Sequence, residues 1–218
     1  MIGLTSLTGL TNFLTQYGST IATLSVEHLW LTIAAMLLAA AIAIPLGIWL
    51  TRAPHWARPV LTVANILQTI PSLAMFGFLL PLPWLGERAA RIAIIALTGY
   101  ALLPILRNTY TGISGIDPSI TEVARALGLT SMQRLIKVEL PLAASFILAG
   151  LRTATVTCIG IATIAAAVGA GGLGELIFRG VASVDNRLVL AGAVPAALLA
   201  LAADGALGLL ERRVKVHA

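Results

Sequence analysis

Charged residues are scarce in this sequence: they make up 11% of its 218 residues, whereas hydrophobic residues make up 58%. A soluble globule of this length has a charged surface, so the composition excludes a water-soluble protein and predicts an integral membrane protein. The length allows about five membrane spans of roughly 20–25 residues together with their loops. The expected fold class is therefore all-α, a polytopic membrane protein with about five transmembrane helices.

Cysteine is almost absent as well. The single cysteine, Cys158, lies in an apolar block, which excludes an intramolecular disulfide, offers no metal site and predicts a small buried side chain. Basic residues outnumber acidic ones by 14 to 9, but they stand at the ends of apolar blocks and are not clustered with aromatic residues. They are interpreted as membrane-topology signals, and no nucleic-acid partner is expected.

Residues 1–26 carry no charge, so they lack the basic start of a cleavable signal peptide. We expect them to form an extracytoplasmic or interfacial segment. The candidate membrane spans follow, at about residues 29–50, 60–80, 92–106, 142–168 and 188–210.

The basic residues orient these spans. If the N-terminus lies outside, nine of the 14 basic residues fall in cytoplasmic segments and four fall in external loops. The positive-inside rule then places the segment 117–141 and the C-terminus in the cytoplasm.

Residues 117–141, which we call the elbow, form the longest polar interruption between apolar blocks. Asp117 is expected to cap a helix that begins at Pro118, where a missing N–H costs nothing. Gly128 stands where a left-handed residue ends such a helix. An apolar stripe recurs along the helix at Ile120, Val123, Ala124 and Leu127.

A second short helix is predicted in the same elbow. Thr130 and Gln133 have the spacing of a capping box, and Pro141 is expected to end the unit. A helix–glycine–helix elbow between membrane spans is typical of a docking surface for another protein. The alternative is an ordinary amphipathic surface elbow.

The elbow resembles the "EAA" loop of ATP-binding-cassette importer permeases. That loop reads E-A-A, three residues, Gly, nine residues and I-x-L-P; this chain has Val123 in place of Ala and Val138 in place of Ile. The resemblance implies coupling helices that dock on a cytoplasmic ATPase. The residues it assigns to that coupling surface are Glu122, Val123, Ala124, Arg125, Gly128, Leu140 and Pro141.

Polar residues at membrane depth form two further groups. Arg152 and Asp204 lie at similar depths from the cytoplasmic ends of their spans, so they are predicted to pair between helices. A proline frees a backbone carbonyl, and polar side chains beside it can line a cavity. The predicted translocation path therefore contains Gln68, Thr69, Pro71, Ser72 and Thr153.

A glycine-rich run is predicted to form a re-entrant turn or an outer gate, because glycine permits close packing and positive φ. It lacks the GK[ST] of a phosphate loop. Its members are Gly169, Gly171, Gly172 and Gly174.

Longer stretches resemble permease subunits of osmoprotectant importers, which carry glycine betaine, carnitine, choline and related amines. The resemblance covers residues 27–213 and rests on QTIPSLAMFGFLLPL, ALTGYALLPILRNTYTGI, ILAGLRTATV, VGAGGLGELIFRG and AGAVPAALLALAAD. It implies a methionine-importer-like permease domain at 27–213 and a cytoplasmic tail at 214–218, in the bacterial cytoplasmic (inner) membrane.

The same resemblance implies a transport subunit and not an enzyme. It implies two ATPase subunits that bind ATP and Mg, a second permease copy or a paralogue, and a separate extracytoplasmic substrate-binding protein. Membrane lipid surrounds the chain, and no cofactor is expected in it. The particular solute stays open, and another small solute such as an amino acid is the main alternative.

Two other classes of protein are weighed against this one. Gly112-Ile113-Ser114-Gly115 spells the GxSG of an intramembrane serine protease, but that chemistry needs a histidine base facing Ser114 at membrane depth. A secondary transporter needs internal repeats or a charged relay, and the sequence contains neither pattern.

Overall fold

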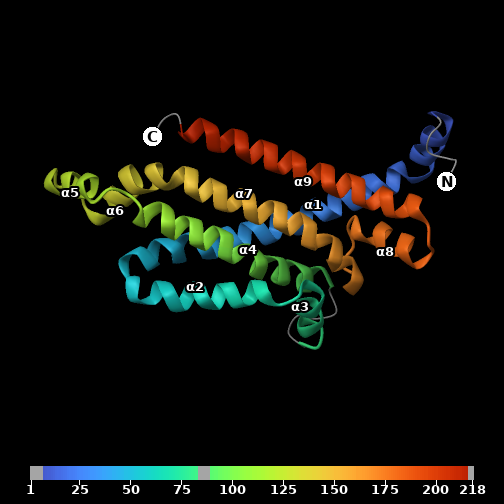
Figure 1. The fold of residues 1–218 in the computed structure, drawn as a ribbon, viewed down its shortest axis with the longest axis horizontal. Coiled ribbons are helices and arrows are strands. Elements are labelled where there is room, and N and C mark those ends of the chain that lie inside the picture. Colours follow the sequence, from blue (N-terminus) through green and yellow to red (C-terminus); the bar gives the residue numbers. More distant parts are fainter. Residues whose placement is uncertain (1–6, 83–88, 216–218) are drawn as a thin grey trace. The chain divides into compact units, whose positions relative to one another are not determined.

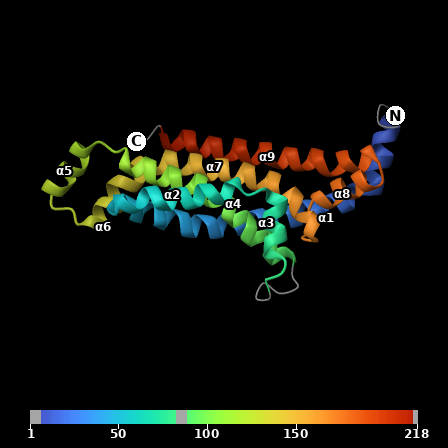
Figure 2. The ribbon, with the colours of Figure 1, turned by 60° about the horizontal axis from the view of Figure 1, so that its bottom comes forward.

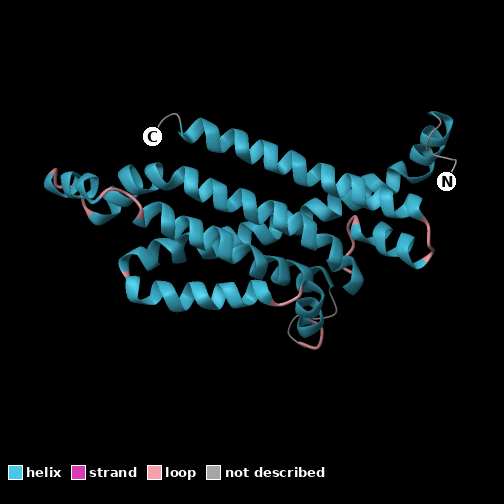
Figure 3. Ribbon diagram, viewed as in Figure 1, coloured by secondary structure: helices cyan, strands magenta, loops and turns pink. Residues whose placement is uncertain are grey.

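The computed structural model describes residues 7–82 and 89–215, and within these ranges every regular element is helical (Figures 1 and 3). The predicted all-α class is confirmed. The elements are α1 Leu7–Arg52, α2 Pro54–Thr69, α3 Ser72–Leu79, α4 Ala89–Ser114, α5 Pro118–Ala126, α6 Ser131–Arg134, a π-helical turn Leu135–Glu139, α7 Leu140–Ala165, a 3-10 turn Ala166–Val168, α8 Gly174–Ala182 and α9 Asn186–Lys215.

Four helical stretches are long and apolar enough to cross a membrane, and the bent pair α2–α3 is a fifth candidate. The four are Gln16–Arg52, Ala89–Ser114, Ser131–Val168 and Asn186–Val214. The expectation of about five spans agrees with this number.

The chain divides into two compact units. The first contains Met1–Ala34, Ser72–Ala96 and Ile159–Ala200, and the second contains Ala35–Pro71, Leu97–Cys158 and Leu201–Ala218. In the first unit, the start of α1 packs on α8 and the start of α9. Its core is Leu24, Leu173, Leu176, Leu188, Ala191 and Ala196, with Tyr17, Ile21 and Leu199 against it.

In the second unit, α1, α4 and α7 approach one another closely at glycines. A Cβ on Gly47 of α1 would lie 2.8 Å from the Thr109 side chain of α4, and one on Gly112 of α4 would lie 2.7 Å from Phe146 of α7. Small residues let membrane helices pack at short range, where dispersion contacts supply the association energy.

The elbow lies at one end of the second unit. Both views place α5 and α6 at the same end as the α1–α2 turn and the C-terminal end of α9 (Figures 1 and 2). The three segments predicted to share one side of the membrane therefore gather at one end.

The second predicted span is not one helix, which corrects the expectation for residues 60–80. Helix α2 ends at Thr69, α3 begins at Ser72, and Ile70 between them is extended with φ −68° and ψ 127°. Proline disfavours the helical conformation of the residue before it, and Pro71 does so here. The helix also begins earlier than predicted, at Pro54, directly after α1.

The prediction that the second helix of the elbow ends at Pro141 is wrong. Helical structure continues from Ser131 to Val168, and Pro141 lies near the start of α7. The π-helical turn Leu135–Glu139 comes directly before it, and the Leu140 N–H bonds to the Leu135 carbonyl. The wider turn accommodates the proline, whose nitrogen cannot donate.

Two other boundaries differ from expectation. Helix α1 runs without a break from Leu7 to Arg52, and the candidate span Gln16–Arg52 begins within the segment predicted to precede it. The glycine-rich segment was expected to be a loop, but Gly174 begins helix α8. The turn predicted at residues 81–88 falls largely outside the described residues.

Candidate functional site

The first helix of the elbow begins as predicted. An oxygen of Asp117 accepts the Ser119 N–H at 2.8 Å, and Pro118 is the first helical residue. This N–H lowers the pKa of the Asp117 carboxyl below its ordinary value. The contact therefore persists at neutral pH and is lost only as the pH falls through the lowered pKa.

The bend between the elbow helices also matches its sequence signals. Gly128 has φ +78°, and its N–H donates to the Arg125 carbonyl at 2.9 Å. The Thr130 hydroxyl accepts the Gln133 N–H, while the Gln133 side chain accepts the Thr130 N–H at 2.9 Å. Local hydrogen bonds therefore fix the bend between the two elbow helices.

The apolar residues of the elbow face outward. Leu127 is 74% exposed and Val123 is 59% exposed, whereas Ala124 is buried. The coupling candidates Glu122 and Arg125 are exposed as well. The remaining large apolar residues exposed in the elbow are Ile120, Met132 and Ile136. Large apolar side chains grouped on a polar segment are typical of an interaction surface.

The structure ties the base of the elbow to the α1–α2 turn through Glu139. This side chain is 2% exposed; one oxygen accepts the Arg134 Nε at 3.0 Å, and the other pairs with Arg52. Leu140 and Pro141 follow directly. Sequence reasoning missed the ion pairs, because the family motif leaves the position of Glu139 open and Arg52 lies 87 residues away.

We expect Glu139→Ala to lower the free energy of unfolding by about 3 kcal/mol, because two guanidinium groups lose their shared buried carboxylate. Denaturant unfolding of the purified chain in detergent measures this change. Glu122→Ala in the same elbow is the matched control, and its exposed position predicts a change within about 0.5 kcal/mol. Equal losses of unfolding free energy in the two variants would contradict the stabilising role of the Glu139 ion pairs.

The structure brings Arg152 of α7 and Asp204 of α9 together. Arg152 Nε and Nη2 donate to the two Asp204 oxygens at 2.5 and 2.7 Å, and Nη1 donates to Glu211 at 3.5 Å. The cluster borders a cavity of about 500 Å³ that Ala149, Thr153, Val156 and Thr157 also line. A bidentate pair of this kind fixes the register of two helices.

A double-mutant cycle tests whether this pair stabilises the helix contact. Arg152→Leu and Asp204→Leu are each expected to lower the melting temperature, because each leaves the opposite charge without its main partner in the membrane. The double variant is expected to lose less than the sum of the two single variants. Strictly additive losses would show that the pair contributes nothing.

The predicted path residues do not form one group. The Gln68 amide donates to the Tyr100 carbonyl at 2.8 Å, and the Tyr100 hydroxyl donates to the Ile70 carbonyl at 2.5 Å. The hydroxyls of Thr69 and Thr153 bond to carbonyls of their own helices. These contacts support the break between α2 and α3, and a transport role for the residues stays a prediction.

The path residues also fall in different units. Gln68, Thr69, Pro71 and Thr153 belong to the second unit, whereas Ser72 begins the part of the first unit that contains α3. Of this group, Thr153 lines the cavity beside Arg152.

Three glycines form the turn between α7 and α8, each with φ near +80°. A Glu27 oxygen accepts the Gly172 N–H at 3.1 Å, and a Cβ on Gly171 would lie 2.6 Å from that oxygen. The Glu27 side chain therefore stabilises the glycine turn through the Gly172 N–H. A gating role for this turn stays a prediction. Gly174 differs from the other three, because it lies in α8.

The neighbouring His28 is fully buried, and its Nε2 lies 3.0 Å from the Ile159 carbonyl. A carbonyl oxygen only accepts, so Nε2 carries the proton. Glu27 and His28 directly precede the first predicted span at 29–50, and sequence reasoning gave them no role. The sequence signal that could have indicated these contacts is a carboxylate and an imidazole directly before an apolar block.

Comparison with known proteins identifies the family. The family model described as "Binding-protein-dependent transport system inner membrane component" matches residues 43–216. The chain belongs to this family. It is a multi-pass inner-membrane permease, as the resemblance in its sequence implied.

Relatives of this permease match nearly its whole length. It is 43% identical over 202 residues to the carnitine transport permease protein OpuCB of Listeria monocytogenes, covering 93% of this chain and 91% of the relative. It is 43% identical over 193 residues to the osmoprotectant import permease protein OsmW of Salmonella typhimurium, covering 88% and 90%. A choline transport system permease protein of Bacillus subtilis, OpuBB, is 41% identical over 202 residues, covering 93% and 92%.

The permease fold also matches solved structures. An inward-facing structure of the MetNI methionine ABC transporter superposes with a TM-score of 0.74 at 25% identity, covering 86% of this chain and 93% of that one. The expected methionine-importer-like fold is confirmed.

The serine-protease alternative does not agree with the permease family. The Ser114 hydroxyl donates to the Tyr110 carbonyl at 2.6 Å, within its own helix. Among the described residues, no group of three or more His, Cys, Asp or Glu side chains could hold a metal ion.

Proposed function

We propose that this permease is the transmembrane subunit of an ATP-driven importer for quaternary-amine osmoprotectants such as glycine betaine, choline and carnitine. The observation that carries the proposal is similarity over nearly the whole chain to permeases named for carnitine, choline and osmoprotectant transport. The chain supplies the translocation path and binds no cofactor. Hydrolysis of ATP, with its Mg²⁺, belongs to partner subunits.

The elbow is the proposed docking surface for the cytoplasmic ATPase. Its apolar residues are exposed in the isolated chain, and Gly128 and the two caps hold them in a fixed shape. One helical stretch, Ser131–Val168, then leads from the elbow to the glycine turn at 169–172. Movement of the elbow by the ATPase would therefore pass along a helix to the proposed gate.

Two ATPase subunits, a second permease copy or a paralogue, and an extracytoplasmic substrate-binding protein complete the proposed importer. The N-terminus lies outside and the C-terminus lies in the cytoplasm. The basic residues support this orientation, because the nine assigned to the cytoplasm all belong to the second unit. The elbow and the C-terminal end of α9 also share one end of that unit.

Uptake into proteoliposomes tests the proposed substrate class. The complete complex is expected to accumulate labelled glycine betaine, choline or carnitine only with ATP inside and binding protein outside. Methionine is the matched control solute, because the similar MetNI structure is a methionine transporter. Accumulation of methionine in place of the amines would overturn the substrate class, and uptake without ATP would overturn the importer.

A further inference from the structure

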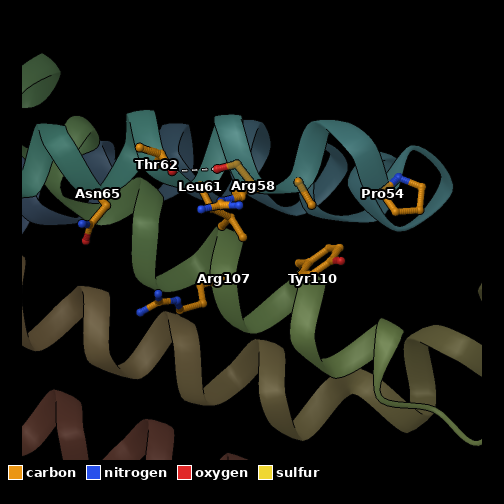
Figure 4. Close-up of a pocket in the computed structure, with 8 residues that line it drawn as sticks. Pro54, Arg58, Leu61, Thr62, Asn65, Arg107 and Tyr110 are labelled. Atoms are coloured by element: carbon orange, nitrogen blue, oxygen red, sulfur yellow. Dashed lines mark hydrogen bonds between the residues drawn. The ribbon is translucent and has the colours of Figure 1, made fainter.

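A second cavity of the second unit lies between α2 and α4. It shares no lining residue with the elbow or with the cavity beside Arg152. It has a volume of about 450 Å³ and is open to the surface. Its lining residues are Pro54, Ala57, Arg58, Leu61, Thr62, Asn65, Arg107 and Tyr110. Figure 4 shows Arg58 on α2 and Arg107 on α4 bordering the same space.

The two arginines lack the carboxylate partners that three other arginines of the second unit have. Arg52, Arg134 and Arg152 each pair with a carboxylate. Among residues 7–82 and 89–215, no carboxylate lies within ion-pair distance of Arg58 or Arg107, and none of the described residues lining the cavity is acidic.

Both charges lie inside helices and not in loops. Arg107 stands seven residues before the end of α4 at Ser114, which is about 10 Å along the helix axis. Arg58 stands four residues after the start of α2 at Pro54, about 6 Å along its axis. Both side chains are exposed in the isolated chain, so their guanidinium groups are accessible to an anion.

Aromatic residues mark this end as the headgroup level of a membrane. Trp49 and Trp56 are both about half exposed, and Trp56 lies next to the cavity residue Ala57. Tryptophan concentrates at the boundary between hydrocarbon and water. The open side of the cavity then faces the depth at which lipid phosphates lie.

We propose that this cavity binds a phosphate-bearing anion, held between Arg58 and Arg107. A guanidinium offers a planar fork of donors that matches two phosphate oxygens. Tyr110 and Asn65 supply further donors at the cavity wall. The phosphate belongs either to an anionic phospholipid headgroup or to a free phosphate ion.

Native mass spectrometry of the purified full chain tests the site and its source. The wild-type chain is titrated with phosphatidylglycerol or phosphatidylcholine, and separately with inorganic phosphate. Two charge-assisted contacts predict that the wild type binds phosphatidylglycerol at least roughly tenfold more tightly than phosphatidylcholine. Binding of inorganic phosphate with the same arginine dependence, without a lipid preference, assigns the site to the free ion.

The decisive variant is Arg58→Gln/Arg107→Gln, which is expected to lose this binding. Arg179→Gln/Arg212→Gln removes the same charge from positions that are exposed as well but lie outside the cavity, and this variant is expected to bind like the wild type. Arg58→Lys/Arg107→Lys keeps the charges and is expected to bind the anion more weakly.

Equal binding by the Arg58/Arg107 and Arg179/Arg212 glutamine pairs would overturn the proposal. So would equal anion binding by the wild type and the lysine variant, a comparison that does not depend on the glutamine variant folding. Absence of both the lipid preference and phosphate binding in the wild type would overturn it too. None of these measurements uses transport, so their outcome is independent of the proposed importer function.

Discussion

Gly128→Pro is expected to abolish ATP-dependent uptake while leaving the chain inserted in the membrane. The native φ of +78° is incompatible with proline, which requires φ near about −65°. Proline would also remove the N–H that donates to Arg125 and disfavour the near-helical conformation of Leu127 before it. The elbow is a local structure, so the damage stays in the docking surface.

Uptake by proteoliposomes measures this effect, and protease accessibility of the elbow confirms insertion. Gly128→Asn is the matched control, because asparagine tolerates the left-handed conformation and no heavy atom lies within 4 Å of a Cβ at this position. It is expected to keep most of the uptake. Full uptake by Gly128→Pro would contradict the role of the elbow.

Gly174→Ala is expected to destabilise the permease by about 3 kcal/mol or more. A Cβ at this position would lie 1.8 Å from the Thr163 carbonyl oxygen and 2.6 Å from its carbon. These are backbone atoms, which cannot relieve the clash by a change of rotamer as a side chain can. Helices α7 and α8 would therefore have to separate, although alanine favours a helix more than glycine does.

Gly160→Ala is the matched control within α7. No heavy atom lies within 4 Å of a Cβ there, so the variant is expected to be neutral or to gain up to about 1 kcal/mol from helix propensity. The melting temperatures of both variants in detergent decide the comparison. Similar melting temperatures for the two variants would rule out the close α7–α8 contact as the cause.

The elbow was predictable because its signals are local. Asp117, Gly128 and the Thr130–Gln133 pair each bond to residues within a few positions along the chain. The Arg152–Asp204 contact followed from depth alone, because two lone charges at equal depth in hydrocarbon have few other partners.

Which of the two prolines would break its helix was not predictable in this way. Pro71 ends a helix where the Tyr100 hydroxyl, 30 residues away, donates to the Ile70 carbonyl. Pro141 lies in a continuing helix, because a π-helical turn precedes it and Leu140 stays helical with φ −65° and ψ −44°. The sequence beside each proline does not reveal these compensations.

Distant pairings were missed for the same reason. Glu139 meets Arg52 across 87 residues, and Glu27 meets Gly172 across 145. Nothing near Glu139 or Glu27 in the sequence indicates which distant residue it contacts. The family motif leaves the position of Glu139 open, and only the structure supplies its partners.

Co-purification with the partner ATPase tests the central claim most directly. The wild-type chain is expected to retain the ATPase subunit through detergent extraction, and Val123→Asp/Leu127→Asp is expected to lose it, because the variant places charges on the exposed stripe. His55→Asp/Arg212→Gln changes the charge by the same amount at exposed positions outside the elbow, and it controls for added charge. Loss of the ATPase in the elbow variant alone is the predicted result. Retention of the ATPase by the elbow variant, or its absence from the wild-type complex, would contradict the account.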